Sequence, residues 1–457
     1  MSDSDDVADR LGRAIGGTVT SIRRLSGGAS RRTSAVDMED AEGNVRALIL
    51  QQQRGDGLTN SSSVALEAAL LRAAGEAGVP VPGVVAAGEA DGLDVGWLVV
   101  DRLEGESIAR RLLRDEAYEE ARRRLTANAA EALARIHTIA LDGLPGLPGL
   151  PASDPLARPL EFLDFTGEVR PVLELAARWL DANRPIATGR TVVHGDFRMG
   201  NLLVDASGLV GVLDWELAHA GDPAEDLGWL SARAWRFGGS GEVGGFGQLD
   251  DLLTRYGEAS GRVIDQATVR WWQAYATMKW AVICALQASA HLSGATRSVE
   301  LAAIGRRVCE SEWDLLGLMG IERPEADDGL VVPSDRSHAP SPFGRPSAGE
   351  LVDAVREYVV DKVMATAEGA AQFDARVAGN VLAMVAREIT LGPAMEEAHR
   401  ARLVGLGFAS DASLAAAIRA GQLDDRLVEV GTALAGSAAD QLRVANPGYL
   451  EPATEGP

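Results

Sequence analysis

A change in the hydrophobic pattern near residue 105 constrains the fold of this chain most strongly. Before it, apolar residues come in short runs of β-type spacing, over 18–25, 32–38, 45–50, 81–85 and 96–102. One helical pattern, over 62–77, interrupts these runs. Beyond residue 105 the apolar residues recur at helical spacing, most clearly over 116–139. The pattern predicts an α+β chain, with a small antiparallel β lobe followed by a mostly helical lobe.

The rest of the chain divides at a segment poor in periodicity. Further helices are expected over 162–183, 247–256, 268–292 and 299–316, with two short β-type runs between 201 and 213. Residues 322–347 are dense in Pro, Asp, Ser and Gly, as linkers are, and helical patterns resume after them. We therefore expect four segments: an N-terminal lobe (1–104), a helical lobe (105–321), a linker (322–347) and a C-terminal helical domain (348–457).

Charge and cysteine content exclude several classes of partner. The chain of 457 residues has 44 Lys and Arg against 66 Asp and Glu, a net charge of −22. Such an excess of negative charge argues against binding nucleic acid or an anionic membrane surface. No apolar run is long enough to cross a bilayer. The only cysteines, Cys284 and Cys309, cannot make a disulfide framework, so we expect buried thiols and a cytoplasmic protein.

The chemistry is concentrated between residues 192 and 228, in the sequence VVHGDFRMGNLLVDASGLVGVLDWELAHAGDPAEDLG. Asp196 stands five residues before Asn201, and a β-hairpin pattern separates Asn201 from Asp214. Phosphoryl transfer needs such a set, namely a carboxylate to accept a hydroxyl proton and oxygen ligands to hold Mg²⁺ on the phosphates. The ordered set predicts a phosphotransferase site.

With these motifs, residues 15–320 resemble the aminoglycoside phosphotransferase and choline kinase family, small-molecule relatives of protein kinases. Residues 194–201 look like its catalytic loop, and 213–216 (LDWE) look like its metal-binding segment. The resemblance implies a bilobal protein-kinase-like fold. It also implies that Asp196 is the catalytic base, that Asn201 and Asp214 bind Mg²⁺, and that phosphate passes from ATP or GTP to a hydroxyl.

The resemblance further implies a nucleotide site in the first lobe. Gly27, Gly28 and Ser30 lie between two predicted strands, as the loop that covers the nucleotide phosphates does. Glu67 matches the helix glutamate that pairs with a strand lysine. Residues 97–104, which include Arg102, resemble the hinge that binds adenine.

Arg198, inside the catalytic loop, is expected either to reach a phosphate or acidic substrate group or to form a structural ion pair. His194 is expected to brace this loop rather than to bind a metal. Asp222 and Asp226 match a family segment that caps a helix and supports the loop from below. Glu216 and His219 are expected at the surface or in hydrogen bonds.

The sequence departs from the family at the strand lysine. Gln51 follows the apolar run that ends at residue 50, and the chain has no lysine before Lys279. A glutamine has no charge to hold the α- and β-phosphates, so Arg54, Arg46 or Arg31 would have to substitute. Without a substitute, the alternative is a nucleotide-binding pseudokinase that serves as a scaffold.

Three features point to a branch of the family. The loop filling FRMG, the segment LDWE and the pattern of 271–292 resemble kinase domains attached to acyl-CoA dehydrogenases, which implies a hydroxyacyl-type acceptor. The acidic composition would instead suit a cationic acceptor. Residues 348–450 resemble an uncharacterised helical domain found beside such kinases, for which we expect a role in oligomerisation or in docking a protein partner.

Overall fold

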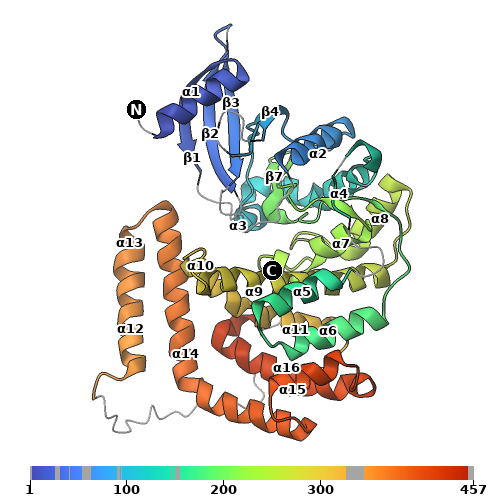
Figure 1. The fold of residues 1–457 in the computed structure, drawn as a ribbon, viewed down its shortest axis with the longest axis vertical. Coiled ribbons are helices and arrows are strands. Elements are labelled where there is room, and N and C mark those ends of the chain that lie inside the picture. Colours follow the sequence, from blue (N-terminus) through green and yellow to red (C-terminus); the bar gives the residue numbers. More distant parts are fainter. Residues whose placement is uncertain are drawn as a thin grey trace. The chain divides into compact units, whose positions relative to one another are not determined.

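The computed structural model describes residues 3–25, 31–40, 42–53, 63–89, 93, 95–144, 146–149, 155–325 and 344–450. The chain forms two compact units. The first consists of residues 1–153 and 185–273, and the second of 154–184 and 274–457. These units cut across the four segments expected from the sequence, because helices on both sides of the linker belong to the second unit (Figure 1).

The first unit begins with an antiparallel sheet in the order β1-β2-β3-β5-β4. Its strands are β1 (Thr18–Arg24), β2 (Arg31–Glu39), β3 (Val45–Gln53), β4 (Val84–Gly88) and β5 (Trp97–Asp101). Alternate side chains of β2 and β3, among them Val36, Leu48 and Leu50, are fully buried in the core of this lobe. The predicted β lobe is confirmed, although β4 begins three residues later than its apolar run suggested.

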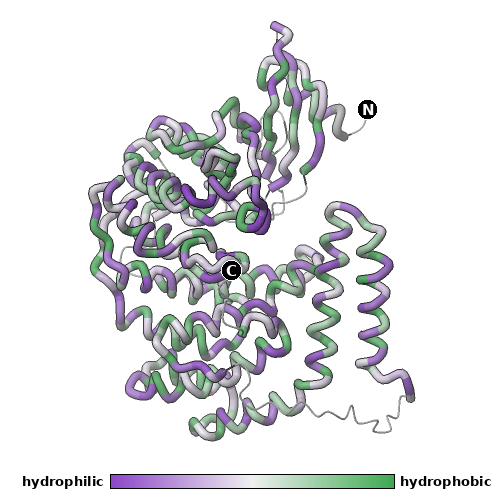
Figure 2. The backbone as a smooth tube through the Cα atoms, turned by 180° about the vertical axis from the view of Figure 1, so that it is seen from behind, coloured by the Kyte–Doolittle hydropathy of each residue, from purple (hydrophilic) through white to green (hydrophobic). Residues whose placement is uncertain are grey.

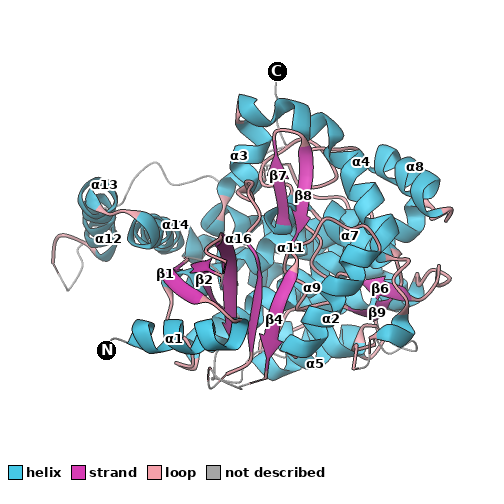
Figure 3. Cartoon of the chain, turned by 90° about the horizontal axis from the view of Figure 1, so that it is seen from above, coloured by secondary structure: helices cyan, strands magenta, loops and turns pink. Residues whose placement is uncertain are grey.

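Two helices complete this lobe (Figure 3). Helix α2 (Val64–Glu76) begins as predicted, since the Ser63 hydroxyl accepts a hydrogen bond from the Leu66 N–H at 3.2 Å. Helix α1 (Asp3–Ile15) was not predicted, because its Asp-rich sequence lacks an obvious apolar run. It packs along β1 and buries Leu11 completely.

The remainder of the first unit carries the motif-bearing loops. Its elements are α3 (Ala109–Arg114), α4 (Glu119–Ile136), β6 (Thr191–Val193), β7 (Leu202–Asp205), β8 (Gly208–Val212), β9 (His219–Gly221), α7 (Ala224–Ser231) and α8 (Leu249–Ser260). Strands β7 and β8 form the expected hairpin, in which Leu202 pairs with Val212. Beyond it, the Leu213 N–H donates to the Asn201 carbonyl at 2.8 Å. The hairpin thus returns the LDWE segment to the end of the catalytic-loop motif.

The second unit is helical. Its elements are α5 (Ala157–Thr166), α6 (Pro171–Ala182), most of α9 (Gln266–Leu292), α10 (Val299–Ile304), α11 (Val308–Leu318), α12 (Ala348–Tyr358), α13 (Met364–Thr366), α14 (Gly369–Leu406), α15 (Asp411–Arg419) and α16 (Leu427–Ala445). The expectation of one helix over 162–183 was wrong. Gly167, with φ of +69°, ends α5, and Pro171 opens α6.

One apolar core joins both sides of the linker within this unit. Val172 and Leu175 of α6 and Trp313 and Leu316 of α11 share it with side chains of the C-terminal helices, among them Leu403, Leu414, Ile418, Leu434, Ala438 and Leu442. Charged pairs tie the same helices together: the Arg419 Nε atom lies 2.9 Å from a carboxylate oxygen of the buried Glu174. The C-terminal helices therefore complete the core of α6 and α11.

Helices α12 and α14 pack side by side as a hairpin, and both carry apolar residues along their length (Figure 2). Several large apolar side chains on them remain at least 37% exposed: Leu351, Val355, Tyr358, Phe373, Val385 and Ile389. No single described helix has the length and apolarity needed to cross a membrane; α14 and α15 meet the criterion only when combined across a bend of 41°.

Candidate active site

The Asp196 carboxylate lies at the centre of the motif residues and is 8% exposed. Its Oδ1 atom accepts hydrogen bonds from Arg198 Nε and from Trp229 Nε1, both at 2.9 Å. Its Oδ2 atom accepts one from Asn201 Nδ2 at 2.6 Å. Three donors from the loop and from α7 therefore fix the orientation of this carboxylate, which a general base requires.

The side chain of Asn201 is held by hydrogen bonds to Asp196. Its amide N–H₂ group donates both to the Asp196 carboxylate and, at 3.0 Å, to the Asp196 carbonyl. With both amide hydrogens engaged within the loop, the Oδ1 atom of Asn201 is left to accept from, or to ligate, another group. This is the orientation that a metal-binding asparagine needs.

Asp214 has an unusual backbone and an unusual side-chain environment. Its φ is +65°, a left-handed conformation that is costly for a residue with a side chain and that clusters at functional sites. Burial raises the pKa of Asp214 to about 7, and the carboxylates of Glu216, Asp196 and Glu67 add to this effect. Its side chain makes no hydrogen bond to another described residue. An electrostatically unfavourable carboxylate of this kind would be stabilised by a cation.

The residues present fit a magnesium ion. The carboxylates of Asp196, Asp214, Glu216 and Glu67 outnumber the two guanidiniums that face them, those of Arg31 and Arg198. Among the described residues, no group of three or more His, Cys, Asp or Glu side chains could hold a metal by itself. Mg²⁺ is commonly bound by one or two carboxylates together with phosphate oxygens and water, and Asn201 and Asp214 could supply such a partial set.

His194 braces the catalytic loop, as expected. Its ring contacts the rings of Phe197 and Trp215, and its Nε2 atom lies 3.2 Å from the Leu213 carbonyl oxygen. Complete burial lowers the pKa of His194, so the imidazole is neutral at physiological pH. The ring therefore links the catalytic loop to the end of β8.

Asp226 supports the loop from below. Its two carboxylate oxygens accept the backbone N–H groups of His194 and Gly195, at 2.8 and 2.9 Å. His137 Nε2 lies 3.2 Å from the same carboxylate. Although burial opposes ionisation, the hydrogen bond and the charge of His137 help to lower the pKa of Asp226 below its ordinary value. Gly195 has φ of +80°, and a Cβ there would lie 2.4 Å from the Leu217 carbonyl oxygen, so this turn requires glycine.

The remaining residues of this segment have structural contacts. Asp222 accepts hydrogen bonds from the Ala224 N–H, at the start of α7, and from the Thr188 N–H, at 2.9 and 2.7 Å. His219 Nε2 lies 3.0 Å from Glu225. Both side chains are buried, so His219 is a hydrogen-bonding residue rather than a surface residue.

In the first lobe, Glu67 is buried beside a cation from β2. The Arg31 guanidinium forms an ion pair with Glu67, and the Arg31 Nη1 atom lies 3.5 Å from Gln51 Oε1. Burial raises the pKa of Glu67, while Arg31 acts in the opposite direction. The Arg31 Nε atom also lies 4.0 Å from Glu216 of the LDWE segment. Arg31 thus connects the first lobe to the LDWE segment.

The structure describes only some of the other residues predicted for the nucleotide site. Gly27, Gly28 and Ser30 lie outside the described residues. Arg102 donates to Asp37 at 2.9 Å, and its backbone N–H donates to the Ala47 carbonyl. Arg198 pairs with Asp196 and also stacks over the Trp235 ring, 4.8 Å from its centroid, so the structural ion pair expected as one alternative is present.

Two tryptophans of the site were missed from the sequence. Trp229 binds the Asp196 carboxylate, and Trp235 supports Arg198. Their rings lie 5.3 Å apart between centroids. The only signal was their position shortly after the GDP segment, which an apolar core position would explain equally well.

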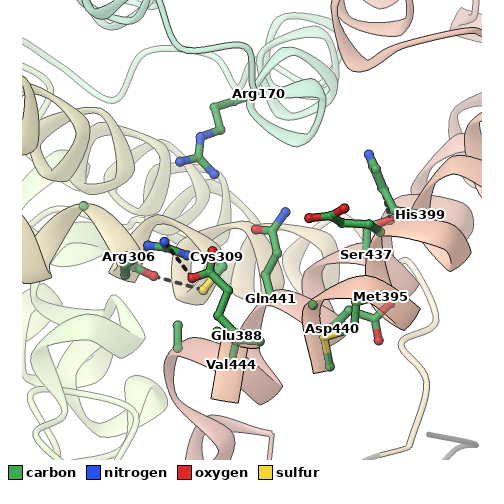
Figure 4. Close-up of a pocket in the computed structure, with 14 residues that line it drawn as sticks. Arg170, Arg306, Cys309, Glu388, Met395, His399, Ser437, Asp440, Gln441 and Val444 are labelled. Atoms are coloured by element: carbon green, nitrogen blue, oxygen red, sulfur yellow. Dashed lines mark hydrogen bonds and ion pairs between the residues drawn. The ribbon is translucent and has the colours of Figure 1, made fainter. Parts of the chain in front are cut away.

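A cavity of about 380 Å³ lies wholly within the second unit and contains none of the motif residues (Figure 4). Two charged groups in its lining, Arg306 and Glu388, form an ion pair at 2.8 Å. His399 lies 2.8 Å from the Ser437 hydroxyl and 2.9 Å from Asp411. Ser437 lies in the middle of α16, where its own backbone N–H belongs to the helix and cannot serve as an oxyanion-hole donor.

Comparisons with known proteins agree with this geometry. Residues 21–272, more than half of the chain, match the family described as "Phosphotransferase enzyme family". Residues 365–449 match a domain of unknown function, DUF6285. The chain also resembles a candidate aminoglycoside phosphotransferase from Ralstonia eutropha, with a TM-score of 0.53 and 19% identity, over 68% of this chain and 98% of that one. At this identity, the likeness concerns the fold.

Two curated relatives belong to the branch suggested by the sequence. The chain is 28% identical to acyl-CoA dehydrogenase family member 10 of Mus musculus over 197 residues, which are 40% of this chain and 18% of that protein. It is 27% identical to acyl-CoA dehydrogenase family member 11 of Gallus gallus over 223 residues, 46% of this chain and 28% of that protein. The chain therefore spans less than a third of the length of either relative.

These matches confirm the predicted resemblance and the α+β fold with its C-terminal helical region. The matched region includes most of the sheet, the catalytic-loop motif and the LDWE segment. On this basis, the chain belongs to the phosphotransferase enzyme family.

Proposed function

We propose that this protein is a Mg²⁺-dependent kinase that transfers the γ-phosphoryl group of ATP or GTP to a hydroxyl group of a small molecule. The observation that carries the proposal is the Asp196 carboxylate, which three donors orient beside the Asn201 amide and near the charge of Asp214. A scaffold that only bound nucleotide would not need a carboxylate held in this way.

In the proposed reaction, Asp196 accepts the proton of the acceptor hydroxyl while that oxygen forms a bond to the γ-phosphorus. The bond between the γ-phosphorus and the bridging oxygen breaks, and the nucleoside diphosphate leaves with that oxygen. Asn201 and Asp214 would hold Mg²⁺, which supplies positive charge to the phosphates when it is bound. Arg198, paired with Asp196, is positioned to neutralise a phosphate or an acidic group of the acceptor.

The nucleotide is proposed to bind between the segment containing Gly27, Gly28 and Ser30 and the hinge that includes Arg102. Among the described residues, the backbone groups of Leu103 and Glu104 make no hydrogen bond, so they are available to the edge of a purine base. Backbone groups of this kind could bind the purine base of either ATP or GTP.

For the acceptor, we favour a hydroxyacyl-type molecule over a cationic one. The two curated relatives are named as acyl-CoA dehydrogenases, which supports an acyl substrate for an associated kinase. The cationic alternative rests on the net charge of −22 alone, and that charge is spread over the whole chain. We place the reaction in the cytoplasm, which the two buried free thiols, Cys284 and Cys309, support.

A nucleotide-binding pseudokinase that docks a partner or a second copy of itself is the second candidate. Gln51 at the lysine position favours it, as do the exposed apolar residues of α12 and α14. If this face joins two copies, Leu351→Ser together with Val355→Ser should convert a dimer into a monomer in light scattering. An unchanged mass would remove this support for the second candidate.

The first test is thermal stabilisation of the protein by ATP and by GTP, with and without Mg²⁺. We expect a Mg²⁺-dependent rise in melting temperature that Asp214→Ala abolishes, because ligands that bind the native state stabilise it.

A screen of hydroxyacyl-CoA and cationic acceptors follows, with Asp196→Asn as the inactive control. Loss of the base should lower kcat by about 10²- to 10⁴-fold. Binding of Mg²⁺ and nucleotide without turnover on any acceptor would favour the pseudokinase.

A further inference from the structure

The strand register brings an arginine to the position where the family has its lysine. In the antiparallel pair of β2 and β3, Gln51 lies opposite Thr33, and Arg31 lies two residues from Thr33 along the same strand. Residues two apart on a strand share a face, and diagonal neighbours of this kind are within reach of long side chains. The distance of 3.5 Å between Arg31 Nη1 and Gln51 Oε1 confirms that the guanidinium reaches the Gln51 side chain.

Arg31 also has the partner that the missing lysine would have. Glu67, on α2, forms an ion pair with Arg31, and the two residues are only 3% and 6% exposed. Such a buried pair is costly to form unless further interactions satisfy its charges. An arginine therefore occupies the buried position beside the helix glutamate.

The guanidinium has unused donors. The Nε and Nη2 atoms of Arg31 are buried and have no hydrogen-bond partner among the residues that the structure describes. Buried donors without a partner are uncommon, and they call for a ligand or another explanation. A guanidinium presents its N–H groups in a planar fork that suits phosphate oxygens. Arg31 lies next to the LDWE segment, since its Nε atom is 4.0 Å from Glu216.

Other cations do not fit this role. Arg46 is five residues from Gln51 on β3 and therefore points to the opposite face, where it pairs with Asp101 at 3.0 Å. Arg198 belongs to the loop of residues 194–201 and pairs with Asp196, so it does not occupy the lysine position beside Glu67. Arg54 lies outside the described residues. Of the three substitutes considered from the sequence, only Arg31 contacts both Gln51 and Glu67 in the described structure.

We propose that Arg31 replaces the strand lysine, so that its guanidinium, anchored by Glu67, binds the phosphate oxygens of the nucleotide through Nε and Nη2. This inference rests on the proposed function, because it assigns a residue to the same nucleotide site. It removes the main argument for a pseudokinase, since the phosphate-binding charge has moved from β3 to β2 rather than disappeared.

Calorimetric titration of the full chain with Mg²⁺-ATP and with adenosine tests the inference. Arg31→Met should weaken ATP binding by about 10- to 100-fold, as expected when charge-assisted hydrogen bonds are lost, while adenosine binding stays unchanged. Arg32→Met is the matched control, because Arg32 is exposed on the opposite face of the same strand. Adding Gln51→Lys to Arg31→Met should restore most of the affinity for ATP.

If Arg31→Met fails to fold, Arg31→Met combined with Glu67→Gln removes both charges of the buried pair. The inference predicts that this double variant folds but binds ATP weakly. Equal affinity of the wild-type protein and either Arg31 variant for ATP would overturn the inference and leave the proposed function standing. Loss of adenosine binding together with ATP binding would also overturn it, because that result indicates a structural role. Absence of ATP and GTP binding to the wild-type protein would overturn both.

Discussion

Asp226 illustrates at the scale of one residue how a buried charge organises the site without touching a substrate. It accepts two backbone N–H groups of the catalytic loop and faces His137. These partners satisfy the carboxylate and help to hold the turn from which Asp196 projects.

We expect Asp226→Asn to lower the free energy of unfolding by about 2–4 kcal/mol at pH 7, because an amide presents a donor where the loop needs an acceptor. The folded-state pKa of Asp226 lies below its ordinary value of 3.8. Its contribution is therefore complete above that value and disappears as the pH falls through the folded-state pKa. Urea unfolding should give a constant difference between pH 8 and pH 5 that shrinks in stronger acid.

Asp181→Asn is a suitable control, since the Asp181 side chain is 60% exposed and pairs only with Arg184 among the contacts described. Its effect should remain within about 0.5 kcal/mol. A difference between Asp226→Asn and the wild-type protein that grew in acid would contradict the sign of the pKa shift.

At this scale the sequence predicted what local motifs encode. The order of Asp196, Asn201 and Asp214 was sufficient to bring them together, because a hairpin of fixed length separates the last two. Trp229 could not be predicted, since its contact with Asp196 depends on how α7 packs against the loop. Arg31 was only one of three candidates until the register of β2 and β3 was known.

At the scale of elements, close packing of α7 against α9 depends on Gly228. A Cβ at this position would lie 2.5 Å from the Trp272 carbonyl carbon and 2.7 Å from the Gln273 nitrogen. These neighbours are backbone atoms of a long helix, so they cannot move aside as a flexible side chain can.

Gly228→Ala should therefore lower the free energy of unfolding by about 1–3 kcal/mol, the usual cost of overpacking. Displacement of α7 should also weaken the hydrogen bond from Trp229 to Asp196 and hence lower kcat. Gly405→Ala in α14 provides the comparison, because a Cβ there meets nothing within 4 Å. This change should leave stability unchanged or raise it by up to about 1 kcal/mol. Equal melting temperatures for both variants would refute the packing argument.

Element boundaries were less predictable than element types. The single helix expected over 162–183 has apolar residues at helical spacing on both sides of the break, so periodicity alone did not reveal it. The break is caused by Gly167, whose left-handed conformation ends α5, and by Pro171, at which α6 begins. Helix α14, by contrast, continues through Pro393, where a break would be the usual result.

Within the second unit, the largest organising feature is the contact between α6 and the helices that follow the linker. Arg419 of α15 pairs with the buried Glu174 and with the exposed Asp164, and Arg178 pairs with Asp424. The sequence could not reveal this arrangement, because the linker composition indicates a boundary but says nothing about which helices pack across it.

We expect Arg419→Ala to lower the free energy of unfolding of this unit by about 1–2 kcal/mol, because Glu174 would stay buried without its partner. The figure is modest because Arg419 is 46% exposed and water screens part of the charge. Arg426→Ala, which breaks an exposed pair with Glu429, should have a clearly smaller effect, because water screens both charges. Equal losses in chemical denaturation would show that burial of Glu174 has no special effect.

The shared core of α6, α11 and the C-terminal helices has a consequence for synthesis. Helix α6 ends at Ala182, whereas α16, which covers it, begins only at Leu427. At roughly 5–20 residues per second, α6 leaves the ribosome some 10–50 s before the last of its partners has been made. During that interval the part of its apolar face that α15 and α16 cover has no native partner, although α11 is made earlier. The nascent chain therefore exposes apolar surface that favours aggregation until α15 and α16 have been made.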